Sequence, residues 1–152
     1  MRAIFASVFV LLSMSAAAFA CPDFGQTGAT YTLTGEQLYS PQDYPVTAGG
    51  GDSLAECGFN NTGYVISAPD FSFILSGTGA YERLEIEVTQ ADCDTVLLVN
   101  SADATWFFDD DTNGTLPVVN LYGTSNTEGR VDVWVGTYGT QACSATLQME
   151  TW

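Results

Sequence analysis

The chain has 152 residues and an uneven charge, because 18 Asp and Glu residues stand against three arginines, with no lysine and no histidine. A surface this acidic repels phosphate backbones and anionic lipid headgroups, so we expect no binding to nucleic acid or to anionic membranes. Without histidine or lysine, the usual routes to an activated serine or thiol, a Schiff base or a catalytic zinc ion are closed.

Residues 1–20 have the form of an export signal. Arg2 supplies a positive start, residues 4–12 are apolar, and Ala18-Phe19-Ala20 resembles a cleavage site. We predict a mature chain of residues 21–152, secreted or periplasmic, that forms a single domain with two arginines against 18 acids, a formal charge of −16. Lipidation of Cys21 is the alternative use of this signal. No later stretch is long and apolar enough for a membrane span.

Short runs of β-forming residues recur along the mature chain, separated by turns rich in Gly, Asn and Asp. Residues 83–89 alternate apolar and polar, which predicts that Leu84, Ile86 and Val88 face a core. Residues 95–100 are almost continuously apolar, as in a central strand covered on both faces. The other predicted strands are residues 30–33, 64–67, 71–75, 105–108, 118–121, 130–135 and 144–151, and helical turns are expected only at 35–39 and 53–57.

This spacing of strands and turns predicts an all-β fold, an antiparallel β-sandwich of the jelly-roll kind. Gly49-Gly50-Gly51 is expected to form a flexible loop within the domain. Neither a second domain nor an internal repeat is visible in the sequence.

Four cysteines follow the export signal, namely Cys21, Cys57, Cys93 and Cys143, and this pattern favours two disulfides. Four cysteines allow three pairings. We predict Cys21–Cys57, which would fix the N-terminal strand across the glycine loop, and Cys93–Cys143, which would join the central strand to the last one. In the chain-entropy description each bridge stabilises the fold by roughly 3–4 kcal/mol.

The most specific motif is an acidic stretch that follows the aromatic run at residues 106–108. Asp109, Asp111, Asn113 and Gly114 stand at positions one, three, five and six of a known calcium-loop pattern. Alternate oxygens can surround one hard cation, and glycine permits the sharp turn. This motif therefore predicts a Ca²⁺ site between two strands.

Other features of the same stretch limit the site. Position twelve is Asn120 instead of a bidentate glutamate, and the flanking residues read as strands, so the motif is not an EF-hand. The carbonyl of Thr115, water or a distant acid such as Asp103 would complete a weak site. The competing interpretation is a solvated turn, because Asp, Asn and Gly are common turn formers.

Aromatic residues provide a second set of candidate binding residues. Trp134 alternates with the charged Arg130 and Asp132, which predicts that its indole lies on a polar face, and Tyr138 follows shortly after. Exposed rings there would contact sugar rings or peptide side chains. We therefore take Trp134 and Tyr138 as ligand candidates, against the alternative that the aromatics fill the core.

The second half of the chain contains, in order, an acidic residue before an apolar strand (93–99), an Asp-rich turn (106–111), Leu116-Pro117 and a strand that starts at Gly129 and runs to Tyr138. In this order the segments resemble the pre-peptidase C-terminal domain, a β-sandwich module attached to many secreted bacterial peptidases. Valine stands here where that pattern often has tyrosine, and Tyr138 comes later. The resemblance implies a jelly-roll-like sandwich that assists secretion or binds substrate and has no catalytic activity of its own.

These features together predict a secreted, non-catalytic β-sandwich module that binds an extracellular polymer or a secreted protein and is stabilised by Ca²⁺. Two alternatives come from other classes: a small glycan hydrolase that uses two carboxylates, and a purely structural envelope or matrix protein. An exposed aromatic strip would favour binding, whereas two acids facing each other across a groove would favour hydrolysis.

Overall fold

The computed structural model describes residues 20–152, so the predicted signal peptide lies outside the described residues except for Ala20. The strands are β1 Ala29–Thr34, β2 Gln42–Ala48, β3 Asp52–Ser53, β4 Tyr64–Val65, β5 Phe71–Ser76, β6 Leu84–Ala91, β7 Thr95–Asn100, β8 Trp106–Asp109, β9 Val118–Leu121, β10 Gly129–Thr137 and β11 Cys143–Thr151. The short helices are α1 Gly35–Leu38, η1 Thr78–Ala80 and α2 Thr124–Thr127. None of these helices is long and apolar enough to cross a membrane.

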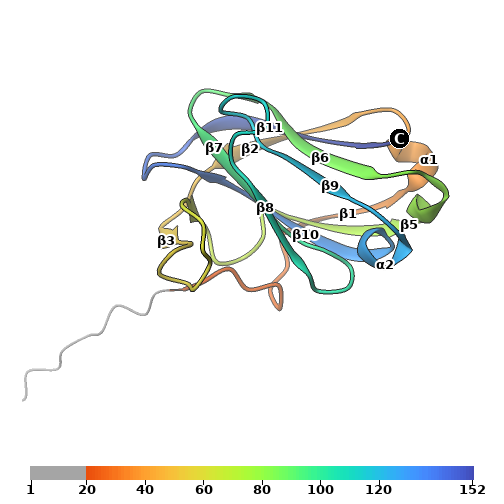
Figure 1. The fold of residues 1–152 in the computed structure, drawn as a ribbon, viewed down its shortest axis with the longest axis horizontal. Helices are drawn as coiled ribbons and strands as arrows, with labels where there is room; N and C mark the ends of the chain where they lie inside the picture. Colours follow the sequence, from red (N-terminus) through yellow and green to blue (C-terminus); the bar gives the residue numbers. More distant parts are fainter. Residues whose placement is uncertain (1–19) are drawn as a thin grey trace, which may run out of the picture.

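The strands form two sheets, and the prediction of an all-β sandwich is confirmed. One sheet has the order β2-β11-β6-β9 and is antiparallel throughout. The other is built on β10, which pairs with β7 on one side and with β5 and then β4 on the other. Strand β8 extends the sheet beyond β7, β3 lies beyond β4, and β1 runs parallel to β5, an exception to antiparallel pairing. In Figure 1 α1 and α2 lie at one end of the body and β3 at the other.

The main core lies between the two sheets. Leu84, Ile86 and Val88 of β6 are at most 1% exposed, as their alternation predicts, while the residues between them face outward. Strand β11 repeats this pattern with Leu147 and Met149, which are fully buried. Such alternation is what an antiparallel sheet with one solvated face requires.

Several local predictions differ from the structure. Strand β2 is not predicted, because Pro45 interrupts its pattern, but β2 is an edge strand, where a missing N–H is tolerated. Gly49 and Gly50 are packed instead of free, while Gly51 is exposed. The Gly49 amide donates to the Val135 carbonyl (2.9 Å), and a Cβ on Gly50 would lie 2.0 Å from the Val65 backbone. Here glycine permits close approach of two backbones.

Strands β7 and β10 are covered on both faces, which creates a second apolar cluster outside the sandwich. Every residue of β7 is buried, as predicted for residues 95–100. On the face away from the main core, Trp134 packs with Leu98 and Val96 of β7 and with Val65 of β4. Phe59, Trp106 and Phe108 are partly buried against this cluster.

The prediction that Trp134 is exposed is wrong. Its side chain is 0% exposed, its ring centroid lies 5.2 Å from that of Trp106, and its indole N–H donates to the Ser67 carbonyl (3.3 Å). Its charged neighbours do not mark a solvated face, because Asp132 is itself buried, paired with Arg130 at 2.9 Å and accepting a hydrogen bond from Ser72 Oγ. The alternation correctly indicates which face Trp134 occupies, but not that other segments cover that face.

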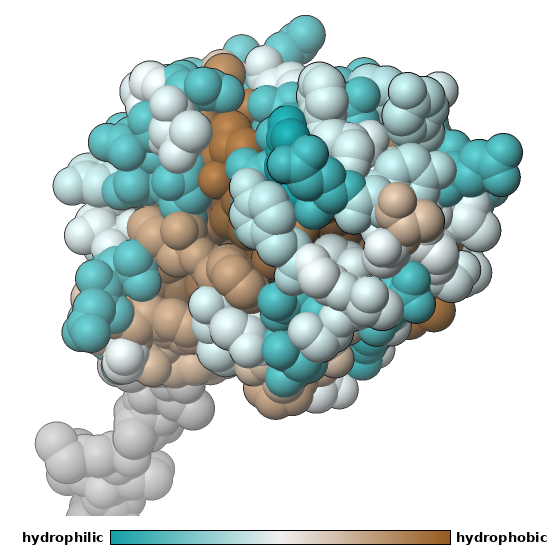
Figure 2. Space-filling model, turned by 45° about the vertical axis from the view of Figure 1, so that its right-hand side comes forward, coloured by the Kyte–Doolittle hydropathy of each residue, from teal (hydrophilic) through white to brown (hydrophobic). Residues whose placement is uncertain are grey.

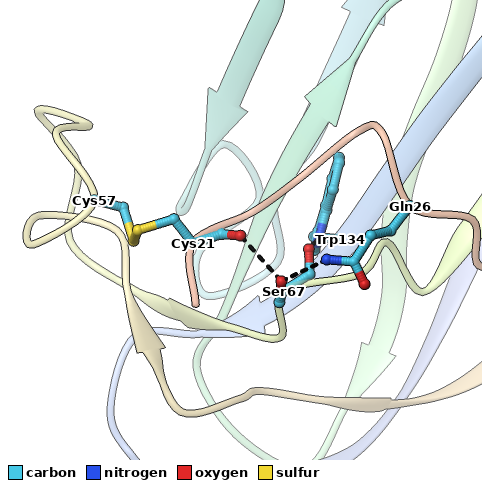
Figure 3. The surroundings of a disulfide bond; sticks show 5 residues. All are labelled: Cys21, Gln26, Cys57, Ser67 and Trp134. Carbon is cyan, nitrogen blue, oxygen red and sulfur yellow. Dashed lines mark hydrogen bonds between the residues drawn. A yellow bond between two sulfur atoms is a disulfide. The ribbon is translucent and has the colours of Figure 1, made fainter. Parts of the chain in front are cut away.

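The N-terminal segment is one of those covering segments. Figure 3 shows the disulfide between Cys21 and Cys57 beside Trp134, with Ser67 Oγ donating to the Cys21 carbonyl (3.1 Å) and accepting from Gln26 Nε2 (2.8 Å). The second disulfide joins Cys93 to Cys143, so both pairs are those expected from the sequence. Because the Cys21 sulfur is bonded to Cys57, the structure does not fit lipidation at this residue.

Asp70 fills a gap in the sheet where β10 changes partner from β5 to β4. Its Oδ2 accepts a hydrogen bond from the Val135 amide (2.8 Å), which neither strand reaches. Burial raises the pKa of the Asp70 carboxyl from its ordinary 3.8 to about 7, although the Val135 N–H lowers it in part. Asp70 is therefore a partly buried acid whose protonated form the fold favours.

Replacing Trp134 with alanine tests its burial. We expect Trp134→Ala to lower the free energy of unfolding by about 3–5 kcal/mol, because it removes a large side chain from a packed cluster. Chemical denaturation of the oxidised protein measures this change. Tyr122→Ala is the control, since Tyr122 is 57% exposed and its removal should change stability by no more than about 0.5 kcal/mol. Equal effects of the two substitutions would contradict the burial of Trp134.

Replacing Asp70 with asparagine tests its raised pKa. Because the folded-state pKa lies above the unfolded value, Asp70 stabilises the fold at low pH, and this contribution is lost as pH rises from about 4 to about 7. Between pH 8 and pH 5 we expect the wild type to gain roughly 2–4 kcal/mol more stability than Asp70→Asn. Urea denaturation of both proteins at each pH measures the difference, and parallel pH profiles would show that the carboxyl titrates normally.

Candidate functional site

The loop between β8 and β9 carries the acidic motif, and Asp109 at its start holds the loop in shape. Oδ2 of Asp109 accepts hydrogen bonds from the amides of Thr112 (3.2 Å) and Val118 (2.8 Å). Its other oxygen accepts from the Thr112 hydroxyl (2.9 Å). The loop is closed further by the Asn113 amide, which donates to the Leu116 carbonyl (3.0 Å). The motif thus forms an ordered turn through its own hydrogen bonds.

The same loop also gathers carboxylates in a way that suits a cation. Asp109, Asp110 and Asp111 each offer an oxygen, and these three atoms lie within 4.8 Å of one another. Calcium binds oxygen at about 2.3–2.6 Å, so ligands on opposite sides of one ion are about 4.6–5.2 Å apart. The spacing therefore fits one Ca²⁺ ion. Calcium takes six to eight oxygens, so these residues would supply only part of its shell.

The other predicted ligands are placed less favourably. The Thr115 carbonyl faces β7, where it accepts hydrogen bonds from the Thr95 amide (3.3 Å) and hydroxyl (3.2 Å). The Asn113 residue is exposed at the loop tip. Within residues 20–152, Asp103 is not one of the three clustered carboxylates. Its Oδ1 instead accepts hydrogen bonds from Ser101 Oγ (2.6 Å) and the Thr105 amide (3.1 Å). These bonds lower the pKa of Asp103, the Ser101 bond most strongly.

A cavity of about 360 Å³ adjoins the acidic loop. It is lined by Asp94, Asp110, Asp111, Gly114, Thr115 and Tyr138. Three chain segments meet there: the residue before β7, the loop after β8 and the residue after β10. The Tyr138 amide donates to the Asp94 carbonyl (3.0 Å), which holds the Tyr138 backbone beside Asp94, and 47% of the Tyr138 surface is exposed. The structure thus brings the ligand candidate Tyr138 to the acidic loop.

Electrostatic repulsion is concentrated at Asp110. Burial raises the pKa of its carboxyl, and the charges of Asp111, Asp109 and Asp94 raise it further, in that order. A cation in the cavity would relieve this repulsion. Sequence reasoning did not name Asp94 or Asp110 as ligands, although Asp94 was visible as an acid placed directly before an apolar strand. Their proximity depends on the pairing of β7 with β8 and β10.

A second, larger groove lies over β6 and β11. It has a volume of about 510 Å³ and is lined by Gln90, Ala91, Asp92, Leu116, Ser144, Ala145 and Thr146. Asp92 is the single carboxylate in this lining. A glycoside hydrolase needs two carboxyl groups on either side of the scissile bond, so this groove lacks the arrangement that the hydrolase alternative requires.

Carboxylates also gather on the outer face of the β2-β11-β6-β9 sheet. Glu85 and Glu150 stand directly opposite each other in register, and Arg83 pairs with Glu85 at 3.3 Å. Burial raises the pKa of Glu87, and the charges of Glu85, Glu150 and Asp43 raise it further. Like charges in direct cross-strand register destabilise a sheet, so this face favours cationic contacts.

The surface is less polar than the net charge suggests. Figure 2 shows apolar residues that reach the surface between hydrophilic ones and extend into a hollow. The large apolar or aromatic residues with the greatest exposure are Phe24, Tyr31, Tyr39, Ile66, Ile74, Tyr122, Tyr138 and Trp152. Of these, Tyr138 lines the cavity beside the acidic loop.

Comparison with known proteins gives one structural likeness. No family model matches the sequence, and a search of curated proteins gives no match. The structure is similar to a pre-peptidase C-terminal domain. That domain belongs to a collagenase of Bacillus anthracis, and the two chains share 11% identity with a TM-score of 0.47 over 84% of this chain and 96% of that one. A domain of this type was the expectation from the order of segments in residues 93–138.

Replacing Asp109 separates its role in the turn from any role in binding a cation. In the presence of EDTA we expect Asp109→Ala to lower the free energy of unfolding by roughly 1–2 kcal/mol, because two amides and a hydroxyl lose their acceptor. Asp111→Ala is the matched control, since Asp111 is exposed and should change stability by about 0.5 kcal/mol or less. Thermal melts measure both, and equal stability of the two variants would mean that Asp109 does not hold the turn.

Proposed function

We propose that this protein is a secreted or periplasmic, non-catalytic β-sandwich module that binds an extracellular polymer through Tyr138 and the acidic loop, with Ca²⁺ stabilising the loop. The observation that carries this proposal is the cavity in which Tyr138 meets Asp94, Asp110 and Asp111. A secreted protein with cationic side chains is the alternative occupant of the same surface.

The chemistry of the cavity supports a binding role. A partly exposed aromatic ring offers an apolar face for a sugar ring, while carboxylates accept hydrogen bonds from hydroxyl groups or pair with ammonium groups. Histidine and lysine are absent from the chain, which leaves the carboxylates as the groups of the cavity that could transfer protons. The partly exposed Tyr138 ring beside them is the feature that favours recognition.

The acidic loop supports a weak rather than a tight calcium site. Its three carboxylates fit one ion, but it lacks the bidentate glutamate of high-affinity loops. We expect a dissociation constant of roughly 10⁻⁴ to 10⁻³ M, as in extracellular modules. Magnesium should substitute poorly, because it demands tighter octahedral geometry and loses water reluctantly.

Thermal melts with calcium test the ion site. At a calcium concentration about a hundredfold above the dissociation constant, binding adds about 2.7 kcal/mol to the stability of the wild type. Asp111→Asn should lose most of this gain, because it removes a negative charge from beside the ion while the hydrogen bonds of Asp109 keep the turn in place. Glu36→Gln removes the same charge from exposed Glu36 in α1, outside the cavity lining, and should keep the gain. An equal response of Asp111→Asn and Glu36→Gln would show that the loop is only a turn.

Co-sedimentation with insoluble polysaccharides tests the binding role. We expect the mature protein to be retained on at least one neutral polymer from a panel of cellulose, chitin and xylan, and Tyr138→Ala to lose this retention because the stacking surface is gone. Tyr122→Ala removes another exposed ring, which does not line the cavity, and serves as the control.

The same experiment distinguishes the two occupants. Retention on immobilised polylysine alone, abolished by salt and by Asp111→Asn, would favour a cationic protein partner in place of a polymer. Retention of wild type and Tyr138→Ala to the same extent would contradict the proposed surface.

A further inference from the structure

The tip of the acidic loop contains a bond that is prone to a chemical change. Asn113-Gly114 is the one Asn-Gly pair in the sequence. Both residues are exposed, and Gly114 has a φ of 77°. Within residues 20–152, no atom outside residues 113–115 lies within 4 Å of the position that a Cβ on Gly114 would occupy. In the same residues no group accepts a hydrogen bond from the Gly114 amide or bonds the Asn113 side chain. The Asn113 side chain and the Gly114 amide are therefore free to meet, although the Asn113 backbone amide is bonded to the Leu116 carbonyl.

We propose that Asn113 is a site of spontaneous deamidation. The Gly114 backbone nitrogen attacks Cγ of Asn113, a new N–Cγ bond forms, and the Cγ–Nδ2 bond breaks. Ammonia leaves, carrying the proton that Gly114 gives up, and a cyclic imide remains. Water then opens the imide at either carbonyl, which yields aspartate with the original backbone or isoaspartate with the backbone rerouted through the side chain. The reaction needs only water, and no oxidant or reductant.

The absence of a side chain at Gly114 makes this step feasible. Ring closure brings the nitrogen of the following residue onto Cγ, and a Cβ on that residue would obstruct the approach. Gly114 offers no such obstacle and lies where the backbone can adopt conformations that other residues avoid. Asparagine is among the residues that limit chemical stability of proteins on heating.

The other asparagines differ from Asn113 in ways that protect them. Asn126 donates its side-chain amide to the Tyr122 carbonyl (3.0 Å), which holds it away from its own backbone. Asn100 is 3% exposed and paired within β7. Asn60 is exposed, like Asn113, but the next residue is Asn61, which carries a side chain. Asn60 is therefore the internal comparison that isolates the effect of glycine.

Deamidation would change the charge of the candidate site. It replaces a neutral amide with a carboxylate two residues from Asp111, in a loop where the carboxylates already repel one another. Any effect of this change on calcium binding rests on the proposed function. Asn113 stands at position five of the calcium-loop pattern, where either Asp or Asn is found. The deamidation itself does not depend on that function.

Peptide mapping by mass spectrometry tests the proposal. The oxidised mature protein is first incubated at 37 °C and pH 7.4 in EDTA. We expect a time-dependent mass gain confined to the peptide containing Asn113, labelling of that peptide by isoaspartyl methyltransferase, and a new, more acidic peak in anion exchange. Asn113→Asp supplies the chromatographic standard for the aspartate product. Gly114→Ala should lose the modification at Asn113.

Two outcomes would overturn the proposal: no mass gain at Asn113, or an equal gain at Asn60 in the same sample. The comparison with Asn60 stands even if Gly114→Ala fails to fold, because it uses wild-type protein alone. Melts of Asn113→Asp with calcium address the ion site separately. A calcium response unchanged from wild type would count against Asn113 as a ligand, and it would leave the mapping result intact.

Discussion

The outer face of β7 and β10 must be kept from water, and much of the rest of the structure follows from this constraint. Both strands are buried on both faces, so the sheet needs cover on the side away from the sandwich core as well. The segment from Cys21 to Gly28 and the region around β3 and β4 supply that cover, and the Cys21–Cys57 disulfide ties the two together. Without this cover, the aromatic cluster around Trp134 would form an exposed apolar patch, through which protein molecules would associate. The disulfide therefore secures a cover as well as restricting the unfolded chain.

The same covered face contains polar groups, and each needs a partner because an unpaired buried group is costly. Asp132 is paired with Arg130 and Ser72, and the Arg130 guanidinium also donates to the Gln26 carbonyl, which fastens the N-terminal segment to β10. Asp70 accepts a hydrogen bond from the Val135 amide at the point where β10 has left β5 and has not yet reached β4. The polar groups thus fix where the covering segments lie, while the apolar cluster provides the driving force.

Periodicity in the sequence was sufficient for most strands of the two sheets, but not for β2 or for the segments that cover the sheets. Strands such as β6 and β11 were predictable because one face meets the core and the other meets water. Trp134 was misjudged because alternation assigns a face to a residue but does not show which distant segment covers that face. Within the candidate site, the acidic loop was recognisable as a local motif. The contribution of Asp94 and the position of Tyr138 were not, because they depend on pairing between strands far apart in the sequence.

The geometry of the acidic loop explains why an ion there would bind weakly and exchange readily. Asp109 already uses its oxygens to hold the amides of Thr112 and Val118, so the turn is formed before any cation arrives. A preformed loop spares the cation most of the cost of ordering the chain, which favours binding. Those same hydrogen bonds, however, compete with the metal for the lone pairs of Asp109, and Asp111 is exposed to solvent that screens its charge. The hydrogen bonds and a cation therefore compete for the same carboxylate oxygens of Asp109. The more strongly the Thr112 and Val118 amides hold these oxygens, the lower is the affinity of the loop for the ion.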